Sequence, residues 1–133
     1  MSSLQVNNIQ SYNANPPVIK SSSGAEVGTF CRAWVNFNGT GTVAIRQSFN
    51  VSSITDNGTG DYTVNFVTAL ADADYSSFAS VSFGSGGYSF PLVNTSSFAV
   101  ITAPTTSSMR FAVLNYNASA WSDPTYAQIA IFC

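Results

Sequence analysis

Apolar and polar side chains alternate along most of this chain. Residues 31–37 give the clearest run, because their odd positions are all apolar: Cys31, Ala33, Val35 and Phe37. Tyr62, Val64 and Phe66 repeat the pattern. A period of two belongs to the β-strand, whose successive side chains point to opposite faces. These runs therefore predict strands with one buried face each.

Turn-forming residues separate the runs. Residues 38–42 contain two glycines and join the alternating runs 31–37 and 43–46, which predicts a β-hairpin. Further apolar runs lie between Gly, Pro, Ser and Asp clusters, at residues 78–83, 88–93, 98–103, 109–116 and 126–133. Short strands at this spacing predict an all-β fold, an antiparallel β-sandwich or barrel-like domain. We expect at most one short helical turn, at residues 69–75.

The first 25 residues have a different character. Leu4, Val6 and Ile9 are spaced apolar side chains, and the following stretch, residues 11–24, is polar and contains Pro16 and Pro17. Consecutive prolines favour an extended, unpaired backbone. We therefore expect residues 1–25 to be an attachment arm with a linker, and residues 26–133 to be the β domain.

The low charge content argues against some classes of binding partner. Charged residues make up 8% of the chain, against about 25% in typical soluble domains. The net charge is −2, and the few basic residues are scattered, whereas a nucleic-acid binder needs clustered cations. No apolar run approaches the ~18 residues of a membrane span. The sequence therefore predicts neither a nucleic-acid partner nor membrane insertion.

The side-chain chemistry does not favour catalysis. The chain has no histidine, the commonest general base and metal ligand. The paired acids Asp56 and Asp61, and Asp72 and Asp74, stand beside small or turn-forming residues, where carboxylates typically form turns. We predict a non-enzymatic protein with no catalytic residue, no metal site and no cofactor.

The two cysteines, Cys31 and Cys133, stand far apart in the chain. One hypothesis is that both are small buried side chains, as is common for cysteine thiols. The other is a disulfide, formed within the chain or with a neighbouring protein. The sequence leaves these two hypotheses open.

Residues 31–46 (CRAWVNFNGTGTVAIR), followed by residues 50–66 (NVSSITDNGTGDYTVNF), resemble a module found in bacteriophage tail-fibre and related virion surface proteins. The strong likeness covers residues 27–75. The resemblance implies a virion protein assembled in the host cytoplasm: a short, homotrimeric tail fibre that attaches to the tail or baseplate and contacts the host surface. A capsid decoration (cement) protein is the alternative, and a glycan-cleaving fibre is a more distant one.

Two groups of residues are candidates for contacts. Arg32, Trp34 and Arg46 lie on the face predicted to point away from the core, where a large aromatic side chain often marks an interface. In a trimer, Arg32 could pair with Asp61 or Glu26. The second group comprises loop residues that combine aromatic rings with amides and suit recognition of host glycans or proteins: Tyr88, Tyr116, Asn117 and Trp121.

Overall fold

The structure, a computed structural model, describes residues 5–10, 17–84, 89–93, 95–97, 100–115 and 120–133. The chain divides into two compact units, Met1–Phe30 and Cys31–Cys133. The first unit contains a small antiparallel hairpin of β1 (Ile19–Lys20) and β2 (Glu26–Gly28). The sequence predicted only an extended linker before Gly24, so this hairpin was missed.

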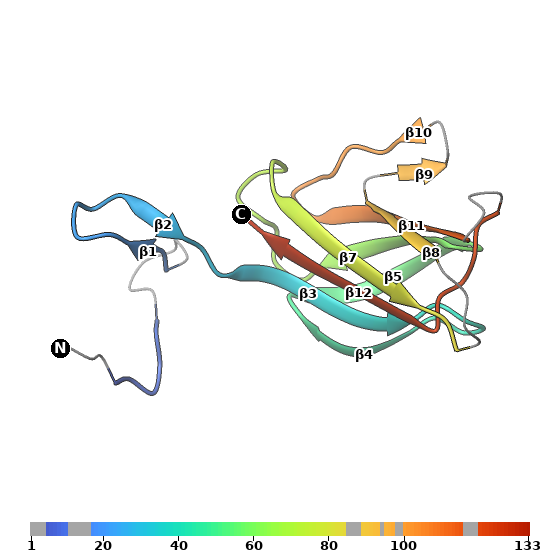
Figure 1. Ribbon diagram of the computed structural model, residues 1–133, viewed down its shortest axis with the longest axis horizontal. Coiled ribbons are helices and arrows are strands. Elements are labelled where there is room, and N and C mark those ends of the chain that lie inside the picture. Colours follow the sequence, from blue (N-terminus) through green and yellow to red (C-terminus); the bar gives the residue numbers. More distant parts are fainter. Residues whose placement is uncertain (1–4, 11–16, 85–88, 94, 98–99, 116–119) are drawn as a thin grey trace. The chain divides into compact units, whose positions relative to one another are not determined.

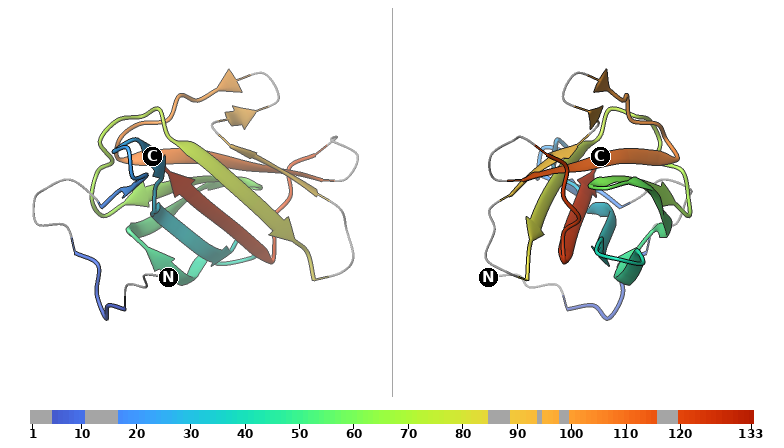
Figure 2. Two further views of the ribbon diagram at one scale, coloured as in Figure 1. Left: turned by 60° about the vertical axis from the view of Figure 1, so that its left-hand side comes forward. Right: turned by 90° about the vertical axis from the view of Figure 1, so that its right-hand side faces the viewer.

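The second unit is an all-β antiparallel sandwich, as predicted. Among the described residues its strands form two four-stranded sheets, with orders β4-β3-β12-β7 and β5-β6-β11-β8, and the small pair β9-β10 (Figures 1 and 2). The strands are β3 (Cys31–Asn38), β4 (Ala44–Phe49), β5 (Val51–Gly58), β6 (Asp61–Phe66), β7 (Ser76–Ser82), β8 (Ser89–Val93), β9 (Thr95–Ser97), β10 (Val100–Ile101), β11 (Ser108–Asn115) and β12 (Tyr126–Phe132).

Pairing between distant segments builds both sheets. The predicted hairpin is present as β3 and β4, with Trp34 opposite Phe49. The last strand, β12, inserts between β3 and β7, so that the beginning and end of the sandwich share one sheet. This arrangement makes β3 and β12 internal strands and leaves β4 and β7 at the edges.

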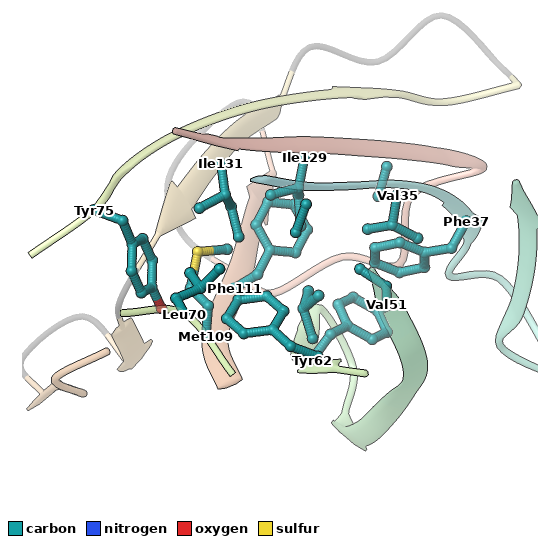
Figure 3. Close-up of a cluster of buried hydrophobic side chains, with 14 of the residues drawn as sticks. Val35, Phe37, Val51, Tyr62, Leu70, Tyr75, Met109, Phe111, Ile129 and Ile131 are labelled. Atoms are coloured by element: carbon teal, nitrogen blue, oxygen red, sulfur yellow. The ribbon is translucent and has the colours of Figure 1, made fainter. Parts of the chain in front are cut away.

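The inward-facing residues of both sheets form one core (Figure 3). Ala33, Val35 and Phe37 are buried, as their alternation predicted. The alternating residues of β6, namely Tyr62, Val64 and Phe66, are buried as well. The Phe37 ring packs edge-on against Tyr62 and Phe111, at centroid distances of 5.2 and 6.2 Å. These aromatic contacts join strands of opposite sheets at the centre of the sandwich.

Two sequence predictions need correction. Residues 69–75 contain no helical turn. Instead Asp72 accepts a hydrogen bond from the backbone N–H of Asp74 at 2.9 Å, which favours a tight bend. The strand predicted at residues 98–103 is also only partly right, since β10 covers Val100–Ile101 and residues 98–99 lie outside the described residues.

A partly buried polar contact joins β6 and the turn before it to the loop that precedes β12. Asp123 accepts hydrogen bonds from the Tyr62 hydroxyl at 2.7 Å and from the Gly60 N–H at 2.6 Å. Burial, and then the hydrogen bond to Asp123, raise the pKa of Tyr62. The neutral phenol is therefore the form that the fold requires.

Tyr75 gives the fold a predicted pH dependence. Burial, with a smaller contribution from the charge of Cys133, raises the pKa of Tyr75 from 10.0 to about 12. Since the folded state holds this proton more tightly than the unfolded state, stability is complete below pH 10.0 and falls as the pH rises toward about 12. At 1.36 kcal/mol per pKa unit, the loss from this residue is at most about 3 kcal/mol.

Urea unfolding between pH 8 and 12 measures this effect. We expect Tyr75→Phe to reduce the alkaline loss of stability, and Tyr126→Phe, at an exposed position, to serve as the matched control. An unchanged slope in Tyr75→Phe would contradict the assignment.

Candidate binding groove

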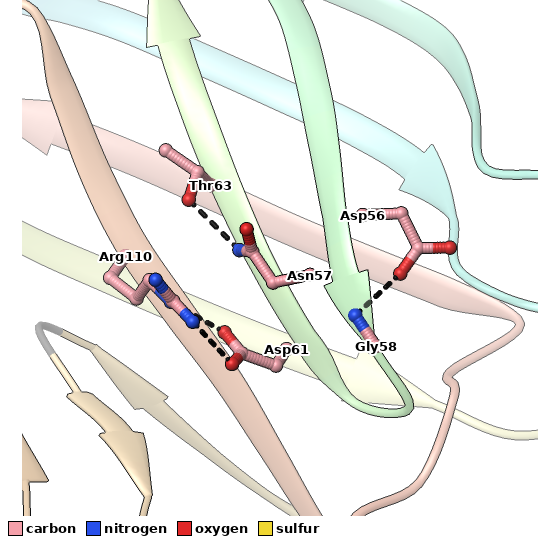
Figure 4. A network of polar contacts seen from close by, with 6 residues as sticks. All are labelled: Asp56, Asn57, Gly58, Asp61, Thr63 and Arg110. Atoms are coloured by element: carbon pink, nitrogen blue, oxygen red, sulfur yellow. Dashed lines mark hydrogen bonds and ion pairs between the residues drawn. The ribbon is translucent and has the colours of Figure 1, made fainter.

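On the outer face of the β5-β6-β11-β8 sheet, the polar side chains of β5, β6 and β11 bind one another (Figure 4). Arg110 donates from Nε and Nη2 to the two Asp61 carboxylate oxygens, at 2.7 and 2.6 Å. Asn57 donates to Thr63 at 2.9 Å, and the Asn65 amide donates to Thr55, also at 2.9 Å. These polar groups are already satisfied within the chain.

The outer face of the β4-β3-β12-β7 sheet is different. It carries aromatic side chains on all four strands, which we call the aromatic face: Trp34, Phe49, Phe78, Tyr126 and Phe132. Phe78 is 65% exposed and Phe49 is 54% exposed, although each is a large apolar side chain. Clusters of exposed apolar side chains typically mark interaction sites.

A groove of about 480 Å³ crosses this face. Two cross-strand rows line the groove, and in the first of them Trp34 lies opposite Ala130 and Ala130 lies opposite Phe78. Ala130 is small, so the two aromatic side chains rise on either side of it. The strands β3, β12 and β7 that carry this row lie side by side (Figure 1).

The next row along the groove is polar. Asn36 lies opposite Gln128, which in turn lies opposite Ser80. The Ser80 hydroxyl donates to Oε1 of the Gln128 side chain at 3.4 Å, and Arg46 Nη1 donates to Oδ1 of the Asn36 side chain at 3.5 Å. Both distances exceed those of good hydrogen bonds, so these groups retain capacity to bind a ligand.

Arg46 packs over Tyr126, one of the side chains of the aromatic face. Its guanidinium carbon lies 4.0 Å from the centroid of the Tyr126 ring, a cation–π contact. Its Nη2 also donates to the backbone carbonyl of Thr125 at 2.7 Å. The charge is thus held over Tyr126, next to the Asn36 side of the groove, and Arg46 is not one of the residues that line the groove.

The predicted interface residues are distributed as follows. Trp34 lines the groove, Arg46 lies on the same face, and Arg32 is half-buried near the start of β3. Asp61, considered as an acid for Arg32, is bound within the chain by Arg110. The hydrogen bonds to Asp61 raise the pKa of the Arg110 guanidinium, so Arg110 keeps its positive charge.

The other sequence-predicted residues lie elsewhere. Tyr88, Tyr116 and Asn117, predicted for host recognition, lie outside the described residues, as does Leu4 of the arm. Trp121 is half-buried and forms an isolated antiparallel bridge with Leu114. In the arm, Val6 is 52% exposed and Ile9 is 65% exposed.

The two cysteines lie at the same end of one strand pair. Cys31 lies opposite Phe132, so Cys133 directly follows the residue that pairs with Cys31. Both side chains are thiols, and the Cys31 thiol donates to the Ala33 carbonyl at 3.2 Å. The disulfide remains a prediction, and the strand register brings its two partners into the same region.

The described residues were also compared with the requirements of a metal site and of the predicted turns. Within the described ranges, no three His, Cys, Asp or Glu side chains form a group that could hold a metal ion. Asp56 accepts a hydrogen bond from the Gly58 N–H at 2.9 Å, the turn role expected from the sequence. In the described part of the chain, no helix has the length and apolar character of a membrane span.

Comparison with protein-family models, with curated proteins and with solved structures found no match to this chain. The functional argument therefore depends on the geometry of the aromatic face and on the sequence resemblance.

The sequence pointed to Trp34 as an interface residue but not to the other side chains used in the groove, which are Asn36, Phe78, Ser80, Gln128 and Ala130. The signal available in the sequence was the alternation of Ala79 and Val81 with Ser80 and Ser82, which places Phe78 on the serine face of the strand. The structure confirms that this face is the exposed one.

Proposed function

We propose that this chain is a non-enzymatic structural protein of a bacteriophage virion, a short homotrimeric tail fibre that contacts the host surface. The observation that carries the proposal is the aromatic face. Five aromatic side chains gather on one outer sheet face, whereas the polar groups of the opposite outer face bind one another. Aromatic residues and arginine are enriched at recognition surfaces.

The two units fit two separate roles, host recognition by the sandwich and attachment by the N-terminal unit. The sandwich presents the aromatic face, and the separate N-terminal unit carries Val6 and Ile9, whose exposed apolar side chains fit attachment or trimerisation. The resemblance of residues 27–75 to tail-fibre modules supports the same assignment.

Gold-labelled antibody imaging of intact particles tests this function. Label at the tail is expected. Label spread evenly over the head would identify a capsid decoration protein instead, and absence of label from purified particles would overturn the virion assignment. Sedimentation of the purified full chain tests the trimer separately, and a monomer at micromolar concentration would contradict it.

A further inference from the structure

We propose that the groove between Trp34 and Phe78 binds a neutral glycan. The inference rests on the proposed function, because it names the class of host molecule that the aromatic face contacts. It depends on the shape of the groove, on the chemistry of its polar row, and on where the nearby charge is held.

The shape suits a flat ring with apolar faces. Trp34 and Phe78 stand on strands separated by β12, so their backbones are about 10 Å apart at the usual strand spacing. Ala130 lies between them and leaves the floor low. A sugar ring on this floor packs its C–H faces against the aromatic walls, the kind of contact for which tryptophan is suited.

The polar row supplies the hydrogen bonds that hydroxyl groups need. Asn36 and Gln128 each offer an amide N–H₂ and a carbonyl oxygen, and Ser80 offers a hydroxyl. A sugar hydroxyl both donates and accepts, so it can bind to any of these groups. Aromatic walls next to a few convergent polar groups are the usual composition of a small-ligand site.

The charges favour a neutral ligand. None of the described residues that line the groove is ionisable. The nearest cation identified by contact, Arg46, is held over Tyr126 and by the Thr125 carbonyl, and it reaches the groove only through a 3.5 Å contact with the side-chain oxygen of Asn36. An acidic sugar or a phosphate would therefore lose its hydration without gaining an ion pair with a lining residue.

The backbone excludes recognition of a peptide by strand addition at the groove floor. β3 and β12 both have hydrogen-bonded neighbours on two sides, so the floor presents no strand edge. Addition of a peptide strand requires such an edge. Recognition in the groove must come from side chains, which is how a glycan is bound.

Tryptophan fluorescence of the full chain, titrated with oligosaccharides, tests the inference. The probes are neutral hexasaccharides of glucose, of mannose and of galactose, with oligogalacturonate as the acidic counterpart. At least one neutral probe is expected to change the fluorescence saturably and to bind at least tenfold more tightly than the acidic probe. Trp34→Ala and Phe78→Ala are each expected to weaken binding at least tenfold, with binding to Trp34→Ala measured by calorimetry.

Phe90→Ala is the matched control. Phe90 is 54% exposed on the outer face of the other sheet, so its loss is expected to leave binding unchanged. The proposal is overturned if no neutral probe binds, if the acidic probe binds equally well, or if Trp34→Ala and Phe78→Ala bind like the parent chain. It is also overturned if the aromatic face proves to be covered by a second copy, seen as dissociation of the oligomer in Phe78→Ala. Virion labelling with no glycan binding would leave the proposed function standing.

Discussion

Replacing Phe37 by alanine is expected to lower the free energy of unfolding by about 3–5 kcal/mol. The side chain is fully buried and packs against Tyr62 and Phe111 from the facing sheet. Its removal deletes apolar burial and leaves a cavity that the surrounding rings cannot fill. Since a domain of this size has a stability of about 5–15 kcal/mol, the loss is a large fraction of the total.

Thermal and urea unfolding followed by circular dichroism measure this loss. The midpoint temperature is expected to fall by roughly 10–20 °C. Phe49→Ala is the matched control, because the same substitution at a 54% exposed side chain removes little burial and is expected to cost less than about 1 kcal/mol. Equal losses at the two positions would contradict the placement of Phe37 in the core.

Replacing Gly60 by alanine is expected to destabilise the sandwich by about 2–5 kcal/mol. Gly60 has a φ of +66°, which costs a residue with a Cβ about 1–2 kcal/mol. A Cβ added there would also lie 2.7 Å from the backbone nitrogen of Ser122 and 2.7 Å from the carbonyl oxygen of Val113. Backbone atoms cannot rotate away, so the loop that contains Ser122 must shift.

That shift would disturb further contacts. The Gly60 N–H donates to Asp123 at 2.6 Å, and the Gly60 carbonyl accepts from the Val113 N–H at 2.7 Å. Because Asp123 also accepts from the buried Tyr62 hydroxyl, movement of this loop would weaken the support of a core ring. We therefore expect the clash to cost about 1–3 kcal/mol beyond the conformational penalty.

Gly41 provides a close control for this substitution. Its φ is +65°, but a Cβ there would meet no atom within 4 Å. Gly41→Ala therefore isolates the conformational penalty of about 1–2 kcal/mol, and the difference between the two variants measures the steric cost at Gly60. Equal unfolding free energies for the two variants would show that the close approach of Ser122 and Val113 is wrong.

Much of the fold could be predicted from the sequence because strand alternation is a local signal. Ala33, Val35 and Phe37 alternate with polar or amphipathic side chains, and burial of one face follows directly from that period. The hairpin formed by β3 and β4 could also be predicted, because the turn between the two runs contains glycines.

The groove could not be predicted in the same way. Trp34 was identified as an outward-facing aromatic residue, yet nothing near it in the sequence indicates Ala130 or Phe78 as neighbours. Their grouping depends on the register of β12 between β3 and β7. The small hairpin of β1 and β2 was also missed, because few apolar residues surround its turn at Gly24.

The sequence by itself determined the all-β class, the hairpin and the inward faces of residues 33–37 and 62–66, because these follow from side-chain period and turn residues. Tertiary structure alone decided that the last strand pairs between two earlier ones. Pairing between strands so distant in the chain depends on closing a long loop and on the fit of whole faces, and neither leaves a local pattern. That pairing brings Trp34, Ala130 and Phe78 into one row, and so creates the groove.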